Sequence, residues 1–275
     1  MMRSLYSGVT GLRSHQTKMD VIGNNIANVN TIGFKSSRVV FQDIFSQTVA
    51  PASAPSADNG GTNPQQIGLG VQLATIDISY APSSTQYTGN TLDLAIDGDG
   101  YFIIQEGSGY TYTRAGNFKT DSENYLVDSN GNYVMGYTGT PDANGTVTTL
   151  ERIKLDPAYT DISINRNGEV VGLEVTTKAT TVIGRIALAT FANPNGLEKI
   201  GGNAYRATVN SGTAVNKAPG SGGTGAINPS SLEMSNVDLT SEFTDMIVTQ
   251  RGFQANSRII TTTDEMLEEL VNMVR

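Results

Sequence analysis

Apolar residues recur every three or four positions at both ends of this 275-residue chain. Near the N-terminus the spacing extends over residues 5–29 and is typical of a helix with one apolar face. Gly8 and Gly11 fall inside this pattern, and each costs about 1 kcal/mol in a helix relative to alanine. We therefore expect a helix that is only marginally stable on its own. Its apolar positions are Leu5, Val9, Leu12, Met19, Ile22, Ile26 and Val29.

The C-terminal end repeats the pattern over a longer span. Steps of four and three alternate from Leu239 onward, as in the heptads of a coiled coil. Ser235 to Asp238 supply residues that cap helix N-termini. The spacing predicts a helix of about 35 residues, or about 50 Å at 1.5 Å per residue. The heptad positions are Leu239, Phe243, Met246, Gln250, Phe253, Ser257, Ile260, Asp264, Leu267, Val271 and Val274.

Between the two ends the period of the apolar positions changes to two. Leu92, Leu94 and Ile96 alternate with other residue types, and residues 101–104 form a short apolar run typical of a buried strand. Asn-Gly pairs, which favour tight hairpin turns, occur at residues 130–131, 144–145, 167–168 and 195–196. We therefore predict a β domain built from many short strands.

Two stretches without periodicity, residues 49–66 and 211–229, are rich in Pro, Ala, Gly and Ser and are typical of linkers. The predicted fold class is α+β, in which discontinuous terminal helices form a coiled-coil-like module beside a central all-β domain. The predicted parts are paired terminal helices at 1–30 and 235–275, an extended connector at 31–70, a β-rich domain at 71–210 and a Gly/Ser linker at 211–234.

The charge distribution favours pairing of the two helices with each other. Residues 1–48 carry five basic and two acidic side chains, whereas residues 231–275 carry eight acidic side chains and three arginines. Opposite charges on flanking faces favour and orient helix pairing. The alternative is an ordinary two-helix layer on one globular domain, for which the two long linkers would serve no purpose. A weakly stable helix pair suits a subunit that orders on assembly.

The composition argues against most enzyme chemistry. The chain has no Cys and one His, His15, which excludes thiolate nucleophiles, disulfides and His-cluster metal sites. The net charge is −8, so a nucleic-acid partner is not expected. Residues 97–100 and 128–132 lack the ligand spacing of a calcium loop, and residues 220–225 lack the lysine of a phosphate-binding loop. We expect no enzyme activity, no cofactor and no metal.

The sequence gives conflicting indications of compartment. It contains no apolar run long enough to span a membrane, and its N-terminal residues do not have the pattern of a cleaved signal peptide. The absence of Cys, however, suits a protein that functions in an oxidising environment. The two observations agree only if export follows another route.

Three segments carry a family resemblance. The first helical pattern ends in a cluster of asparagines that are costly inside a helix and are expected to act as caps or as hydrogen-bond formers between subunits. Together with residues 92–102 and two C-terminal segments, 235–239 and 246–257, this cluster closely resembles the signatures of bacterial flagellar rod and hook proteins. The matching positions include Asn24, Asn25, Ala27, Asn28, Gly33, Phe34, Asn236, Val237, Gln250 and Arg251.

This resemblance implies a specific architecture and a specific route of export. In the family, the terminal helices pair in an inner coiled-coil tube that lines the export channel, the β domain lies outside it, and subunits stack helically. Export by the flagellar type III apparatus, without a cleaved signal, would resolve the conflict over compartment. The implied partners are further copies of the chain, neighbouring axial proteins (rod, hook cap and hook–filament junction) and the export apparatus, with no membrane insertion.

Within the family, residues 60–70 and 249–256 resemble short hook proteins of Gram-positive type and favour an extracellular hook subunit, the joint between rod and filament. The alternative is the distal rod protein of the basal body, which has a similar length, the same Met-Met-Arg-Ser-Leu opening and a comparable segment at 45–66. A hypothesis from another class is a secreted peptidoglycan-acting enzyme or a carbohydrate-binding β protein.

Overall fold

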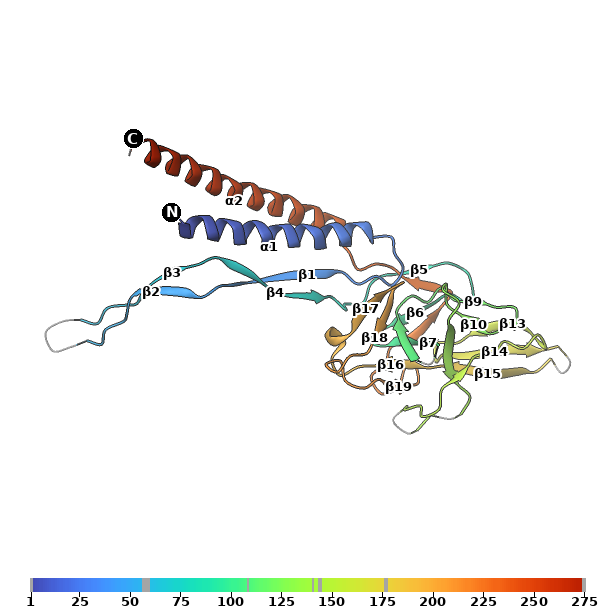
Figure 1. Cartoon of the computed structure of the whole chain (residues 1–275). Helices are drawn as coiled ribbons and strands as arrows, with labels where there is room; N and C mark the ends of the chain where they lie inside the picture. The colour runs from blue at the N-terminus through green and yellow to red at the C-terminus, as the bar shows by residue number, and fades with distance from the viewer. Residues whose placement is uncertain are drawn as a thin grey trace. The chain divides into compact units, whose positions relative to one another are not determined.

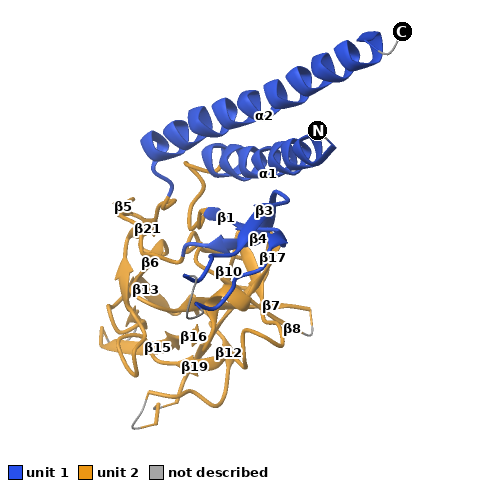
Figure 2. Cartoon of the chain, turned by 90° about the vertical axis from the view of Figure 1, so that its left-hand side faces the viewer, with its two compact units in different colours: residues 1–27, 37–79, 237–275 blue, residues 28–36, 80–236 orange. Residues whose placement is uncertain are grey.

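The structure is a computed structural model that describes residues 2–55, 60–107, 109–139, 141–142, 145–175 and 178–273. It contains an N-terminal helix, a large β-rich part and a C-terminal helix, which confirms the predicted α+β class (Figure 1). The chain divides into a helical unit of residues 1–27, 37–79 and 237–275, and a β-rich unit of residues 28–36 and 80–236 (Figure 2). None of the described helices is long and apolar enough to cross a membrane.

The helical unit contains two long helices and a long strand hairpin. Helix α1 (Met2–Ala27) packs against helix α2 (Leu239–Met273), and α2 has the predicted length of 35 residues. Strand β1 (Ser37–Asp43) pairs antiparallel with β4 (Val71–Ile78), and both contact α1. Beyond them, β2 (Ser46–Ala50) and β3 (Gln65–Gly68) continue the hairpin as a two-stranded ribbon.

The hairpin differs from the extended connector expected at residues 31–70. Val39, Val40 and Phe41 of β1 are half-buried, and their strand pairs along its length with β4. This short apolar run was obscured by the Pro-, Ala- and Gly-rich composition that follows it. Residues 31–36, in contrast, belong to the β-rich unit.

The β-rich unit is built on a 13-stranded sheet whose main path runs β13-β14-β15-β11-β7-β8-β18-β17. Most of its strands are short, as predicted. The strands of this path are β7 (Tyr101–Glu106), β8 (Gly109–Thr113), β11 (Tyr133–Tyr137), β13 (Tyr159–Ile164), β14 (Glu169–Glu174), β15 (Thr180–Ile186), β17 (Glu198–Gly201) and β18 (Ala204–Arg206). The others in this sheet are β9 (Lys119–Thr120), β10 (Leu126–Val127), β12 (Glu151–Arg152), β16 (Leu188–Thr190) and β19 (Val215–Lys217).

Strand β7 is buried on both faces. Phe102 belongs to one apolar cluster with Phe118 and Leu188, whereas Tyr101 and Ile103 belong to a second cluster. Successive side chains of a strand point to opposite faces, so a strand between two cores has a continuous apolar run. The buried strand predicted at residues 101–104 is therefore confirmed.

The structure confirms two of the hairpin turns predicted at Asn-Gly pairs and contradicts one. The pair at 167–168 joins β13 to β14, and the pair at 130–131 joins β10 to β11, as predicted. In both turns the glycine has a positive φ and its N–H donates to the carbonyl three residues earlier. The hairpin predicted at 195–196 is wrong, because these residues form a short 3-10 turn, η1 (Pro194–Gly196). Asn144 of the remaining pair, like Val274 of the heptads, lies outside the described residues.

Residues 211–234, expected to be a Gly/Ser linker, are ordered parts of the β-rich unit. They include β19, β20 (Ala226–Pro229), which pairs with β6 (Leu94–Asp97), and β21 (Ser231–Glu233), which pairs with β5 (Thr85–Tyr87). Ile227 is fully buried, and Thr224 Oγ1 donates a 2.7 Å hydrogen bond to Ala218 O. Glycine-rich tight turns between very short strands have the same composition as a flexible linker, which explains the difference.

Candidate assembly surface and buried polar junction

Glycines bring α1 and α2 into close contact in the helical unit. A Cβ atom on Gly8 would lie 3.3 Å from Ile260 Cγ1, and one on Gly11 would lie 2.6 Å from Asn256 Nδ2. On α2, a Cβ atom on Gly252 would lie 2.7 Å from the His15 ring. These contacts show that the helices run antiparallel. Sequence reasoning treated Gly8 and Gly11 only as helix-weakening residues, although their i, i+3 spacing places them on one face.

Asn25 connects three elements of the helical unit. Its side chain is 1% exposed. Its Nδ2 donates to Ser37 O at 2.8 Å and to Glu242 Oε1 at 2.9 Å, and its Oδ1 accepts from the Ser37 N–H at 3.0 Å. The end of α1, the start of β1 and the first turn of α2 are thereby tied together. Burial raises the pKa of Glu242, which the hydrogen bond from Asn25 opposes.

Asn28, a second signature asparagine, contacts Thr31. Asn28 Oδ1 accepts a 3.1 Å hydrogen bond from Thr31 Oγ1, and Asn28 O accepts from the Thr31 N–H. These contacts form a turn after α1. Asn24, Ala27, Gln250 and Arg251 have exposed side chains, and Val237 is half-buried.

His15 lies half-buried in the helical unit. Its ring meets Phe41 of β1 edge-on at a centroid distance of 6.2 Å. Its Nδ1 atom is buried and has no hydrogen-bond partner among the described residues. Burial lowers the pKa of His15, and the charge of nearby Lys18 lowers it further. Lys18 itself forms an ion pair with Asp245 of α2 at 3.2 Å.

The predicted pairing residues do not all face the partner helix. Ile22 is buried, and Leu5, Leu12, Met19, Ile26, Met246, Ile260 and Leu267 are half-buried. The exposed members are Val9, Leu239, Phe243, Phe253 and Val271, at 37%, 39%, 49%, 38% and 67%. On α2, the fully buried positions are instead Thr249 and Thr263. The contact stripe is therefore displaced from the predicted heptad seam.

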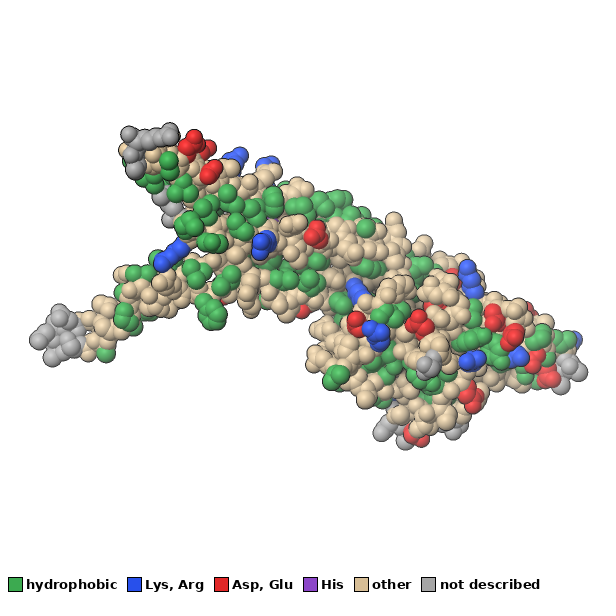
Figure 3. Space-filling model, in the orientation of Figure 1, with side chains coloured by type: hydrophobic (Ala, Val, Ile, Leu, Met, Phe, Trp, Pro, Cys, Tyr) green, Lys and Arg blue, Asp and Glu red, His purple; other side chains and the backbone are tan. Residues whose placement is uncertain are grey.

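Apolar side chains remain exposed on α2 outside this contact stripe. Leu239, Phe243 and Ile247 follow one another at steps of four residues and share one face. Toward the C-terminal end, Met266, Leu270, Val271 and Met273 are between 41% and 78% exposed. The space-filling view shows apolar side chains along the helices and the hairpin (Figure 3). Groups of exposed apolar side chains are typical of interaction sites.

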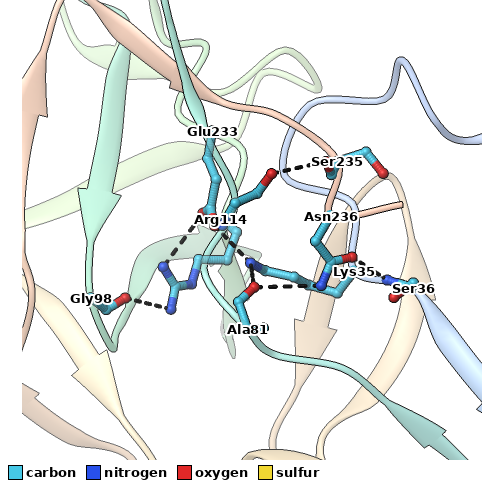
Figure 4. A network of polar contacts seen from close by, with 9 residues as sticks. Lys35, Ser36, Ala81, Gly98, Arg114, Glu233, Ser235 and Asn236 are labelled. Atoms are coloured by element: carbon cyan, nitrogen blue, oxygen red, sulfur yellow. Dashed lines mark hydrogen bonds and ion pairs between the residues drawn. The ribbon is translucent and has the colours of Figure 1, made fainter. Parts of the chain in front are cut away.

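A buried ion cluster lies in the β-rich unit (Figure 4). Lys35 Nζ contacts Glu233 Oε1 at 2.7 Å and donates to Ala81 O at 2.9 Å. Arg114 Nη1 contacts Glu233 Oε2 at 3.4 Å, and its Nη2 donates to Gly98 O at 2.9 Å. Burial lowers the pKa of Lys35, although the hydrogen bond and the charge of Glu233 oppose this.

Signature residues surround this cluster. The Gly33 N–H donates to Glu233 O at 2.8 Å, and Gly33 has a φ of +67°. A Cβ atom there would lie 2.8 Å from Ala115 N, so both the backbone conformation and the space require glycine. Asn236 Oδ1 accepts from the Ser36 N–H at 2.7 Å, and Lys199 Nζ lies 4.8 Å from the centre of the Phe34 ring. In this unit the signature residues Gly33 and Asn236 therefore hold residues 33–36 against residues 233–236.

A cavity of about 290 Å³ also lies in the β-rich unit. Its walls include Tyr80, Asp99, Tyr101, Phe191 and Lys217. Burial raises the pKa of Tyr80 to about 12, so its hydroxyl group stays protonated at neutral pH. The described residues contain no group of three or more His, Cys, Asp or Glu side chains that could hold a metal ion.

Family models match three parts of the chain. The flagellar basal body rod protein family matches residues 5–35 and the D1 domain of the flagellar hook protein FlgE/F/G matches residues 95–172. The C-terminal family of the flagellar basal body rod FlgEFG proteins matches residues 228–273. The three segments overlap the regions that carry the resemblance, although the middle match begins at residue 95 and so leaves out residues 92–94.

Similar proteins cover the whole chain. The flagellar basal-body rod protein FlgG of Bacillus subtilis (strain 168) is 55% identical over the full length of both chains. FlgG of Caulobacter vibrioides is 39% identical over 97% of each chain. The flagellar hook protein FlgE of Borreliella burgdorferi is 31% identical over 99% of this chain and all of its own length. The predicted resemblance is thus confirmed: this chain belongs to the flagellar FlgE/F/G family of rod and hook structural proteins.

Proposed function

We propose that this chain is a rod subunit that polymerises helically with copies of itself. This is the alternative raised by the sequence, in place of the hook subunit that residues 60–70 and 249–256 favoured. The relative lengths support it. The alignment with the rod protein of Bacillus subtilis spans 276 positions, whereas alignments with two hook proteins span 441 and 463 positions. Those hook proteins therefore contain inserted residues that this chain lacks.

The exposed apolar surface of the helical unit is the observation that carries the assembly proposal. A two-helix module must bury its apolar faces against something. Here α1 covers only one stripe of α2 and leaves two other groups of apolar side chains exposed, one near each end of α2. Both groups are available to a neighbouring copy of the same helix pair.

The C-terminal end of α2 extends past the start of α1. Gly8, six residues after Met2, faces Ile260, and α2 continues 13 residues beyond Ile260 to Met273. The difference corresponds to about 10 Å of helix at 1.5 Å per residue. This projecting end carries exposed Leu270, Val271 and Met273, and also Glu268 and Glu269.

A second copy of the chain fits this projecting end. The N-terminal part of α1 carries exposed Met2 and Tyr6 beside exposed Arg3. Arg3 complements Glu268 and Glu269 in charge, while Met2 and Tyr6 offer apolar contacts for Leu270 and Val271. The proposal therefore places the C-terminal end of α2 of one subunit beside the N-terminal end of α1 of a neighbouring subunit. Its other parts, namely helices lining an export channel, type III export and contacts with neighbouring axial proteins, rest on the family resemblance.

Assembly can be measured with a matched pair of variants. Val271→Asp places a charge in the projecting apolar end, and Val209→Asp places one on an exposed position of the β-rich unit, where the valine is 104% exposed. We expect Val271→Asp to abolish sedimentable polymer and Val209→Asp to leave it unchanged. Normal polymerisation of Val271→Asp would contradict the proposed contact.

An experiment in cells is required to distinguish a rod subunit from a hook subunit. In a strain lacking this chain, we expect electron microscopy of basal bodies to show missing or shortened rods. Re-expression of the natural chain should restore them, whereas Val271→Asp should not. Complete rods that lack only the hook would overturn the rod assignment and restore the hook hypothesis.

A further inference from the structure

The ion cluster of Lys35, Arg114 and Glu233 joins parts of the chain that are far apart in sequence. Lys35 and Glu233 are 198 positions apart, and Arg114 and Glu233 are 119 positions apart. The side chains of Lys35, Arg114 and Glu233 are 0%, 3% and 1% exposed. Among the described residues, Glu233 is the one acid that forms an ion pair with either cation.

Folding of the β-rich unit without Glu233 would bury two cations with no anion. Lys35 and Arg114 also donate to Ala81 O and Gly98 O, but a carbonyl group carries no net charge that would offset theirs. Removing one partner of a buried ion pair is strongly destabilising, whereas replacing every partner with apolar residues is often tolerated. The cluster therefore destabilises one state in particular. This is the state in which the β-rich unit has packed but residue 233 has not yet joined it.

The segment that carries Glu233 also completes the backbone pairing of the unit. Strand β21 pairs with β5, the Met234 N–H donates to Ser84 O at 3.1 Å, and Ser83 Oγ donates to Ser235 O at 2.9 Å. Just before it, Ile227 of β20 is fully buried in the apolar cluster that contains Phe102. Residues 226–236 thus supply a strand, a core side chain and the anion together.

We propose that this cluster is a latch that makes folding of the β-rich unit conditional on the arrival of residues 231–236. A chain that emerges N-terminus first, from a ribosome or from a secretion channel, then keeps the unit open until its C-terminal segment is delivered. This effect requires no partner protein, because burying the unpaired charges of Lys35 and Arg114 opposes packing of the β-rich unit before residues 231–236 are available. It concerns the folding of a single chain and is independent of whether the subunit belongs to rod or hook.

The order of folding can be measured on the full-length chain. The chain is refolded from urea, and pulse-labelled hydrogen exchange records when each amide becomes protected. We expect the amides of β7 and β8 to gain protection in the same kinetic phase as the Met234 amide. Protection of β7 and β8 in an earlier phase would overturn the proposal, because the unit would then close before its C-terminal segment joins.

A variant without the three charges separates their effect on the order of folding from the effect of apolar packing. In the charge-free variant Lys35→Met/Arg114→Met/Glu233→Met, we expect β7 and β8 to gain protection before Met234. Unchanged, simultaneous protection in this variant would show that packing sets the order and would overturn the latch. If this variant does not fold, earlier protection of β7 and β8 in the natural chain still overturns the proposal.

A matched single substitution gives the size of the effect. We expect Glu233→Gln to shift the folding equilibrium toward the unfolded state by roughly 100-fold or more. Glu198→Gln removes the partner of Arg206 from an ion pair of 2.8 Å whose side chains are 58% and 53% exposed. We expect this control to shift the equilibrium by less than about 5-fold. Equal shifts for the two variants would show that the buried cluster imposes no special penalty.

Discussion

Gly11 and Gly23 lie on the same helix but in different surroundings, which gives a quantitative test of the helix pairing. A Cβ atom on Gly11 would lie 2.6 Å from Asn256 Nδ2, whereas one on Gly23 would meet nothing within 4 Å. Either replacement by alanine gains about 1 kcal/mol of helix propensity. At Gly11 this gain is opposed by overpacking, which costs about 1 kcal/mol or more because the Asn256 side-chain amide has to move away from the new Cβ atom. We therefore expect Gly23→Ala to stabilise α1 and Gly11→Ala to destabilise the helix pair or leave it unchanged.

The informative quantity is the difference in the free energy of unfolding between Gly23→Ala and Gly11→Ala. The gain in helix propensity is the same in both variants and cancels in this difference. We expect the free energies of unfolding to differ by about 1–3 kcal/mol, measured by urea unfolding of the full chain followed by far-ultraviolet circular dichroism. Gly252→Ala, whose Cβ atom would lie 2.7 Å from the His15 ring, should behave like Gly11→Ala. Equal stabilisation by Gly11→Ala and Gly23→Ala would refute the close contact between the helices.

Three further predictions concern the helical unit. Asn25→Ala removes three buried hydrogen bonds and should lower the free energy of unfolding by about 2–3 kcal/mol in the same assay; a loss below about 0.5 kcal/mol would contradict its connecting role. Burial lowers the pKa of His15, so the unfolded chain binds a proton that the folded unit resists. Stability should therefore decrease as the pH falls below about 6.5, and His15→Gln should reduce this slope between about pH 5 and 7; an unchanged slope would exclude His15 as its source. Leu267→Asp should prevent polymer formation while the β-rich unit keeps its hydrogen-exchange protection, since Leu267 is half-buried on the helix pair; normal polymers would show that this pair is not the assembly module.

The helices were predictable from the sequence, but the stripe by which they pair was not. Apolar spacing correctly indicated a helix of about 35 residues at the C-terminal end. The buried stripe, however, contains Thr249 and Thr263, whose hydroxyl groups donate to carbonyls four residues earlier at 2.6 Å. Hydrogen-bonded threonines and glycines can fill a helix contact that hydropathy does not count as apolar. The signal that could have located this contact is the spacing of Gly8 and Gly11 together with Gly252.

The ion cluster could not have been found by local reasoning. Lys35 directly follows the signature residue Phe34, and Glu233 lies two residues before the signature segment 235–239, but nothing in the sequence around either residue indicates that its side chain is buried. Charged residues are seldom buried unless they are paired, and their pairing here depends on strand order across 198 positions. The strands within residues 211–234 could not be predicted for a related reason, because the composition does not show that β20 and β21 pair with β6 and β5.

The two units differ in how completely each buries its own apolar surface. This difference indicates which of the two units gains more from contacts with further subunits. The β-rich unit encloses Phe102 and Ile227 fully and pairs both of its buried cations, Lys35 and Arg114, with Glu233. In the helical unit Asn25 joins α1, β1 and α2 through hydrogen bonds, but Phe243, Ile247 and Val271 stay exposed by 49%, 59% and 67%. The ribbon of β2 and β3 has almost all of its residues exposed, and a two-stranded ribbon alone is marginal in water. Further subunits can bury the apolar surface that the helical unit leaves exposed. We therefore expect polymerisation to stabilise the helical unit more than the β-rich unit. Hydrogen exchange on polymer and monomer would measure this: we expect protection gained on assembly to concentrate in α1, α2 and the ribbon, and an equal gain in β7 and β8 would contradict the division of roles.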